Sequence, residues 1–94
     1  IIDPGIGFGK TLEQNYTILA RLSRLSMFGC PILLGLSRKS MIGKVLGADM
    51  DGRLIGTVSA NVIGLAAGAR VLRVHDVVEH VEAIKIFTTM EAVR

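Results

Sequence analysis

Three clusters of charged or hydroxyl side chains follow apolar runs of the chain, and their residue types suit ligand binding. They are Asp3, residues 37–40 (Ser-Arg-Lys-Ser) and residues 73–76 (Arg-Val-His-Asp). Folds built on parallel strands bind ligands where the carboxyl ends of the strands meet. Two cations and two hydroxyls at such a strand end predict a site for an anionic or polar ligand. A solvated turn capped by Ser40 is the alternative explanation of residues 37–40.

The last cluster has a spacing that fixes the directions of its side chains. Arg73 and His75 are two residues apart in a predicted strand, so both point to one face, while Leu72 and Val74 point to the other. An arginine inside a strand is costly to bury unpaired, and it should therefore meet a carboxylate or a bound anion. Beside the basic turn, Arg73 and His75 would form a compact anion cradle. An ion pair with Asp76 or another carboxylate is the alternative.

The first cluster opens a loop with three glycines. Asp3 can accept two hydrogen bonds from the edge of an amidine-like heterocycle, or it can cap N–H groups of its own loop. Lys10 has the same two options, a ligand or its own loop. The glycines match neither the dinucleotide fingerprint nor the P-loop, which requires a further glycine upstream of the Gly-Lys pair. His80, on a predicted helix, is expected at the solvated surface.

These clusters need a scaffold of alternating strands and helices, and the apolar periodicity predicts one. The predicted strands cover residues 1–3, 32–36 and 71–75, and the predicted helices cover residues 12–27, 41–46, 53–67 and 77–91. Such alternation produces parallel strands joined by right-handed crossovers, which defines an α/β fold. All three polar clusters would then lie at one end of the sheet.

Capping boxes predict the starts of two helices, at Thr11 with Gln14 and at Asp76 with Glu79. The apolar positions of the last helix that should face inward are Val78, Val81, Ile84 and Phe87. The helix over residues 53–67 carries a face of small residues spaced four apart, Gly56, Ala60 and Gly64. That face predicts close approach by another helix, a second subunit or another part of the chain.

Composition disfavours several classes of protein. The net charge is +3, the charges are interspersed and the aromatic residues are three Phe and one Tyr, which together disfavour nucleic-acid binding. Cys30 is the lone cysteine, which fits a reducing compartment, and zinc-ligand spacing does not occur. The most apolar stretch, residues 57–69, is too short to span a bilayer. We therefore predict a cytoplasmic protein with neither nucleic-acid nor membrane partners.

The chain is also more apolar than its length explains. It has 94 residues, of which 50% are hydrophobic, and a mean hydropathy of +0.52. In so short a chain much of the surface stays in water, so this excess predicts missing neighbours, either more polypeptide or a second copy. We therefore expect a fragment.

Three motifs in this order resemble the C-terminal part of the dihydropteroate synthase family. They are D-P-G-I-G-F-G-K from Asp3, G-L-S-R-K-S-M-I-G from Gly35 and R-V-H-D-V from Arg73. The resemblance implies a (β/α)8 TIM barrel, with residues 1–94 as the last three βα units of its single pterin-binding domain. It also implies a role in folate biosynthesis, where 7,8-dihydropterin-6-ylmethyl diphosphate and 4-aminobenzoate condense to dihydropteroate and pyrophosphate. The family is the target of sulfonamide drugs.

The resemblance further assigns residues to parts of the two substrates. They are Asp3 and Lys39 for the pterin, Gly7, Phe8 and Ser40 for the aminobenzoate, and Arg73 and His75 for the diphosphate. Mg²⁺ would shield the diphosphate through a ligand outside this chain. The intact enzyme would be a homodimer, and the 94-residue chain alone is expected to be inactive.

Two other functions stay open at this point. A related pterin-binding methyltransferase would share the barrel, but it releases no diphosphate for Arg73 and His75 to hold. A truncated, non-enzymatic half-barrel that only self-associates would explain the high hydropathy and the small-residue face.

Overall fold

The computed structural model describes residues 1–49 and 51–94 and centres on a parallel sheet. Strands β1 (Ile32–Leu34) and β2 (Ala69–Leu72) pair in parallel, with Leu34 opposite Leu72. A third segment joins the other edge of β1 through a single bridge between Ile2 and Ile32. The predicted strand at residues 1–3 is therefore reduced to one bridging residue, because Pro4 has no N–H to continue a ladder.

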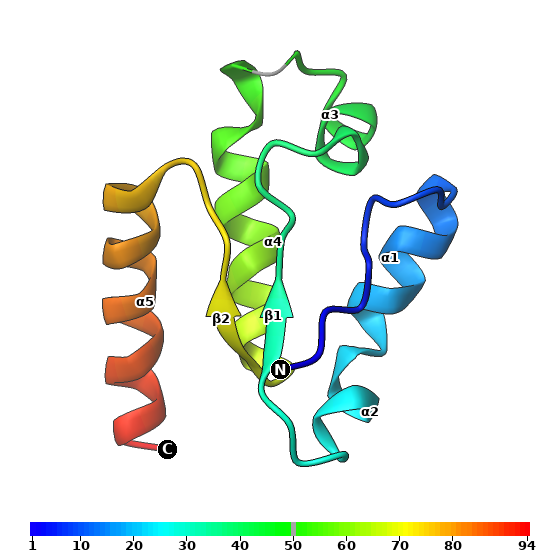
Figure 1. Ribbon diagram of the computed structural model, residues 1–94. Coiled ribbons are helices and arrows are strands. Elements are labelled where there is room, and N and C mark those ends of the chain that lie inside the picture. The colour runs from blue at the N-terminus through cyan, green and yellow to red at the C-terminus, as the bar shows by residue number, and fades with distance from the viewer. Residues whose placement is uncertain (50) are drawn as a thin grey trace.

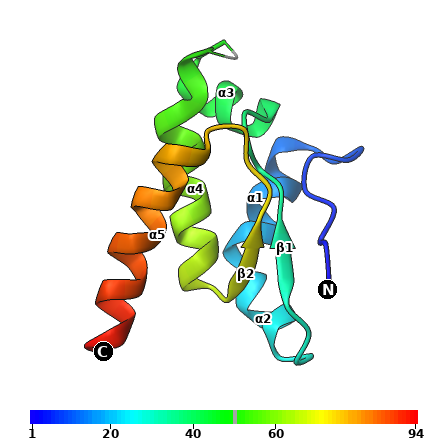
Figure 2. The same cartoon turned by 60° about the vertical axis from the view of Figure 1, so that its left-hand side comes forward.

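Within residues 1–49 and 51–94, six helical segments surround the strands. They are α1 (Leu12–Ala20), α2 (Leu22–Ser26), α3 (Ser40–Leu46), the 3₁₀ turn η1 (Asp51–Arg53), α4 (Leu54–Ala66) and α5 (Val77–Ala92). Both strand arrows point the same way, toward the end of the molecule that holds α3 (Figure 1). The turned view shows α4 and α5 together on one side of β2 (Figure 2). The alternating order that the sequence predicts is confirmed, and so is the placement of the strand ends at one edge.

The elements differ from their predicted bounds in two ways. The single helix expected over residues 12–27 is broken at Arg21, which has φ −108° and ψ 15°. Neither glycine nor proline marks that position, so helix propensity could not predict the break. The two main strands end earlier than expected, because the ladder stops after the Arg73 N–H donates to the Leu34 carbonyl (N···O 3.0 Å), and β2 also begins two residues earlier than predicted, at Ala69. Arg73 and His75 consequently lie just beyond β2.

The small-residue face of α4 packs inside the chain. Gly64 is buried against Leu34 of β1, and a Cβ added at Gly64 would overlap the Leu34 side chain. One turn earlier, Ala60 is 6% exposed and belongs to the same core. The structure thereby decides between the predicted neighbours, since the closely approaching elements are β1 at Gly64 and α3 at Gly56, both of the same chain.

The beginning of α5 departs from three predictions. Asp76 is the N-cap residue, but its side chain makes no capping hydrogen bond. His80, expected in solvent, is buried, with Nε2 2.9 Å from Asn61 Nδ2 and Nδ1 2.7 Å from the Asp76 carbonyl oxygen. Val78 and Val81, expected to face inward, are 68% and 45% exposed. Relative to the prediction, α5 is therefore rotated about its axis. His80 occupies an inward position, where it is held by Asn61 of α4.

Candidate functional site

A cavity of about 440 Å³ lies where the N-terminal loop meets the segments that follow β1 and β2. Its lining residues are Asp3, Phe8, Leu33, Gly35, Ser37, Lys39, Arg73 and His75. Five of the predicted site residues thus surround one hollow. Gly7 is outside the lining but contacts a residue that belongs to it, and Ser40 is an exposed residue at the start of α3. The structure therefore brings together six of the seven predicted residues.

Lys39 reaches across this cavity to the glycine loop. Its Nζ donates to the Ile6 carbonyl oxygen (2.6 Å) and lies 4.6 Å from the centroid of the Phe8 ring. Burial lowers the pKa of the Lys39 ammonium below its ordinary value, with Asp3 opposing this effect and Arg73 adding to it. The ammonium is therefore partly desolvated and retains donors for a ligand, because it has three N–H bonds.

Gly7 has the close approach to Lys39 that only a glycine permits. Its φ is +87°, and a Cβ at this position would lie 2.7 Å from Lys39 Cδ. The Gly7 N–H donates to the side-chain oxygen of Asn15 (N···O 2.8 Å), which is buried in α1. Asn15 therefore supports the loop, a role that we did not predict; a polar residue on the inward side of an apolar helix is the signal that could have revealed it.

His75 is held by Ser37 from the neighbouring strand end. The Ser37 hydroxyl oxygen accepts from the His75 backbone N–H (3.0 Å) and lies 2.8 Å from His75 Nδ1. When this hydroxyl donates its own proton to Nδ1, the neutral ring carries its proton on Nε2. His75 would then offer an N–H donor without being charged, which suits an anionic ligand.

Arg38 does not line the cavity, although the sequence places it in the basic turn. Its guanidinium forms an ion pair with Asp76, with Nη2–Oδ1 and Nε–Oδ2 distances of 2.6 and 3.2 Å. Asp76, which the sequence suggests as an alternative partner of Arg73, is therefore paired with Arg38 instead. Arg73 lines the cavity, and none of the ion pairs among the described residues involves it.

The N-terminal loop satisfies part of its own polar groups. Asp3 Oδ1 accepts from the Gly5 N–H (2.8 Å), and Lys10 Nζ donates to the Gly5 carbonyl oxygen (2.9 Å). Lys10 thus takes the loop-capping option that the sequence left open. Asp3 combines both options, because its side chain caps the loop and also lines the cavity.

The ion pair of Asp76 predicts an acid-sensitive contribution to stability. The hydrogen bond from Arg38 holds the pKa of Asp76 below its ordinary value of 3.8. A carboxyl with a depressed folded-state pKa stabilises the fold above its unfolded-state pKa and loses that contribution as the pH falls through the folded-state pKa. The difference in free energy of unfolding between wild type and Asp76→Asn should therefore be constant above the ordinary value and shrink below it.

Chemical denaturation followed by circular dichroism at several pH values measures this difference. Glu82→Gln, an exposed substitution on α5, is the control and should show no comparable change. A difference for Asp76→Asn that persists unchanged into strong acid would contradict the role of the pair.

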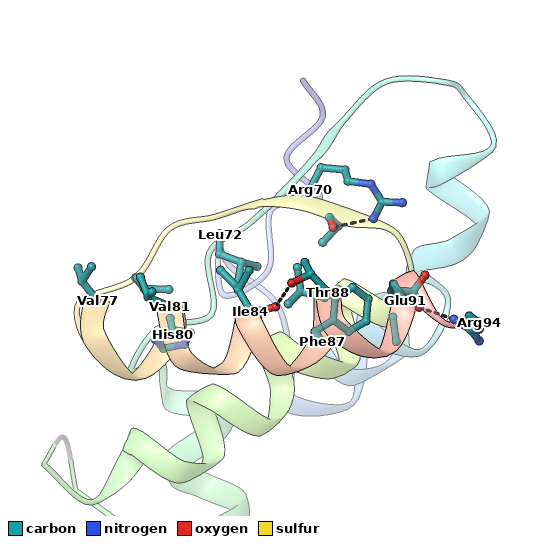
Figure 3. Close-up of a pocket in the computed structure, with 14 residues that line it drawn as sticks. Arg70, Leu72, Val77, His80, Val81, Ile84, Phe87, Thr88, Glu91 and Arg94 are labelled. Carbon is teal, nitrogen blue, oxygen red and sulfur yellow. Dashed lines mark hydrogen bonds and ion pairs between the residues drawn. The ribbon is translucent and has the colours of Figure 1, made fainter.

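A second hollow, of about 570 Å³, lies on the other face of β2 and has a different character. Leu72, Val74, Val81, Ile84 and Phe87 contribute apolar side chains to it. Figure 3 shows Val81, Ile84 and Thr88 of α5 directed toward β2. Because Leu72 and Val74 line this groove and Arg73 and His75 line the first cavity, the predicted alternation of faces is confirmed.

Comparison with known proteins identifies the class to which this fold and cavity belong. Residues 1–75 match the family described as pterin binding enzyme, so the chain belongs to that family. Its curated relatives include dihydropteroate synthases. The Escherichia coli K12 enzyme is 49% identical over 92% of the chain, and the Clostridium beijerinckii enzyme is 52% identical over 92%. The chain spans about a third of their length, 30% and 32% respectively.

Solved structures confirm the fold class. A Yersinia pestis enzyme with a pterine-sulfa conjugate superposes with a TM-score of 0.95 at 48% identity, over 98% of this chain and 36% of its own. A Stenotrophomonas maltophilia dihydropteroate synthase with imidazole in its active site also has a TM-score of 0.95, at 46% identity and with the same 36% coverage of its own chain. The chain therefore has the predicted α/β fold, as a partial (β/α)8 barrel.

Proposed function

We propose that this chain supplies substrate contacts of a dihydropteroate synthase. The reaction joins 7,8-dihydropterin-6-ylmethyl diphosphate to 4-aminobenzoate and releases pyrophosphate. The observation that carries this proposal is that Arg73 and His75 share one cavity with Asp3, Lys39 and Phe8. A methyltransferase has no diphosphate to hold there. The relatives described above are synthases, which favours this function over the methyltransferase and over a purely self-associating half-barrel.

The electrostatics of the cavity suit a polyanionic leaving group. Lys39, Arg73 and His75 face a hollow to which Asp3 contributes the carboxylate. Burial is the main cause of the lowered pKa of Lys39, and the nearby positive charge of Arg73 adds to it. A bound diphosphate would relieve the repulsion between these two cations. Arg73 can donate two parallel hydrogen bonds to phosphate oxygens, because its guanidinium is planar.

The chemistry asks the protein mainly for positioning and charge stabilisation. Cleavage of the carbon–oxygen bond to the diphosphate leaves a resonance-stabilised pterin cation, which the aminobenzoate nitrogen attacks. Arg73 and His75 would stabilise the departing negative charge with donors already in place. Asp3 and Lys39 would orient the pterin ring, and orientation of two reactants supplies a large share of such a rate enhancement.

The aminobenzoate contacts are proposed on two kinds of support. Phe8 lines the cavity with 65% of its surface exposed, and Gly7 turns the loop beneath Lys39. An exposed aromatic ring at a cavity wall can cover the ring of a second substrate. Ser40 lies outside the lining, and its proposed role in seating the aminobenzoate stands on the family resemblance and its position next to Lys39.

Mg²⁺ finds no site within these residues. The described parts of the chain, residues 1–49 and 51–94, contain no group of three His, Cys, Asp or Glu side chains that could hold a metal ion. We therefore derive no step through the metal. If Mg²⁺ accompanies the diphosphate, we propose that its protein ligand lies outside this chain.

Other features of the whole protein are proposed on the same basis. We place residues 1–94 in one pterin-binding domain, because α5 packs on α4 and extends the part that matches the family. The substrates, a homodimeric assembly and a cytoplasmic location are proposed for the intact enzyme. Over residues 1–49 and 51–94, each helix is too short or too polar to cross a membrane.

A turnover assay tests the proposed function. The polypeptide as its source produces it should form dihydropteroate and pyrophosphate from the two substrates, and added pyrophosphate should inhibit it. The purified 94-residue chain should show no turnover, since a complete barrel needs about 250 residues. Methyl transfer without pyrophosphate release would overturn the proposal, and turnover by the 94-residue chain would contradict the predicted inactivity.

A further inference from the structure

The backbone at Arg38 is unusual for a bulky residue. Among residues 1–49 and 51–94, Arg38 is the residue other than glycine that has a positive φ, 55°. Such a conformation is unfavourable for L residues with long side chains and persists where surrounding contacts over-determine it. The contacts around Arg38 therefore indicate which structural role this conformation has.

Three residues hold Arg38 from different sides. The Arg38 N–H donates to the Thr57 hydroxyl oxygen (3.1 Å), and the Arg38 carbonyl oxygen accepts from Arg53 Nη1 (2.9 Å). The side chain is fixed by its ion pair with Asp76. Thr57 is fully buried in α4, with 0% exposure, and it has no access to a ligand in the cavity. The backbone N–H, the backbone carbonyl and the guanidinium are all engaged.

The two neighbours of Arg38 are the residues that reach the cavity. Ser37 holds the His75 backbone and ring, and Lys39 reaches the Ile6 carbonyl and the Phe8 ring. Arg38 itself does not line the cavity. A change of backbone conformation at Arg38 would redirect Ser37 and Lys39 together, because they are its immediate neighbours.

We propose that Thr57, Arg53 and Asp76 are positioning residues, which clamp Arg38 in its left-handed conformation and so direct Lys39 and Ser37 into the site. This inference rests on the proposed function, because it assigns the clamp to the same cavity. The competing explanation is that Arg38 is a cation that contacts the diphosphate directly. The two differ in what a buried change at Thr57 would do.

The test uses Thr57→Val in the polypeptide as its source produces it. Valine keeps the shape of threonine but removes the acceptor for the Arg38 N–H. We expect kcat/KM for the two substrates to fall by about 100-fold, the size of effect that misplacement of positioned groups produces. Thr57→Ser keeps the hydroxyl and should stay within about threefold of wild type. Unchanged kcat/KM in Thr57→Val would overturn the inference.

A matched control separates positioning from lost stability. Ala60→Gly lies one turn along the same helix and weakens it, since glycine is a poor helix former, but it leaves the clamp intact. It should leave KM for both substrates unchanged under conditions where the protein stays folded. A loss of kcat/KM in Ala60→Gly equal to that in Thr57→Val would overturn the inference. If Thr57→Val does not fold, Asp76→Asn replaces it as the test variant, because the Asp76 side chain is partly exposed. The same fall in kcat/KM is then expected for Asp76→Asn.

A readout without substrates distinguishes failure of this inference from failure of the proposed function. Nitrogen NMR shifts of the His75 ring and hydrogen exchange of the Arg38 amide report the clamp directly. Both should change in Thr57→Val and stay as in wild type in Thr57→Ser. If the wild type forms no dihydropteroate but Thr57→Val still changes both readouts, the proposed function alone is contradicted. Unchanged NMR and exchange values in Thr57→Val would contradict the clamp.

Discussion

In the polypeptide as its source produces it, replacing Lys39 with methionine is expected to lower kcat/KM for the proposed formation of dihydropteroate by about 10- to 150-fold, the range that corresponds to one hydrogen bond involving a charged group. Methionine keeps an unbranched apolar stem against Phe8 but removes the ammonium that donates to Ile6 and faces the cavity. The loss should appear mainly as a raised KM for the pterin substrate. Steady-state kinetics with each substrate varied in turn measure this split.

The chain offers a matched control for this substitution. Lys44 is an exposed lysine on α3, five residues further along the chain, and Lys44→Met should change kcat/KM by less than about twofold, because surface substitutions away from a site have small effects. A Lys39→Met variant that keeps the wild-type KM for the pterin substrate would remove Lys39 from the proposed pterin contacts. A change in the KM for aminobenzoate alone would place Lys39 next to the second substrate instead.

Replacing Leu34 with alanine is expected to lower the free energy of unfolding by about 2–5 kcal/mol, the range for such truncations of buried leucines. Leu34 is fully buried between the sheet and α4, where it meets Gly64. Chemical denaturation of wild type and variant under identical conditions measures the difference. Leu46→Ala is the control, because Leu46 is 53% exposed, and its cost should be much smaller.

A second substitution tests whether the small-residue face is built for Leu34. Gly64→Ala alone should lower stability, since overlap with the Leu34 side chain costs about 1–3 kcal/mol or more and outweighs the helix preference of alanine, about 1 kcal/mol. In the Leu34→Ala background the same change should raise stability, because the new methyl group occupies vacated space. A rise in both backgrounds would contradict the close packing of Gly64 against Leu34.

Much of the architecture could be predicted from local sequence. The capping box of Thr11 and Gln14 is present in both directions, and α3 ends at Gly47 in the left-handed conformation. The alternation of Arg73 and His75 with their apolar neighbours is a property of extended backbone, so it holds although β2 ends before them. These predictions succeed because each depends on residues a few positions apart.

The residues of the candidate site were brought together for a related reason. Lys39 and Arg73 follow β1 and β2, and the ends of parallel strands meet at one edge whatever the details of packing. Proximity of these side chains therefore follows from topology alone. Ser40, predicted from the motif, does not line the cavity, because it begins α3 and is exposed there. Topology brings strand ends together but does not fix the direction of each side chain in the turn.

The sequence by itself therefore determined the α/β order, the strand-end location of the site and the cationic character of its residues. Only the tertiary structure decided which polar groups pair. It paired Asp76 with Arg38, so that Asp76 neither caps α5 nor meets Arg73, and it buried His80 against Asn61. The physical reason is that a charged or polar side chain takes its partner from whichever surface is packed against it. That surface comes from residues far away in the sequence; Arg38 and Asp76, for example, are 38 positions apart. Local periodicity carries no information about a partner at that separation.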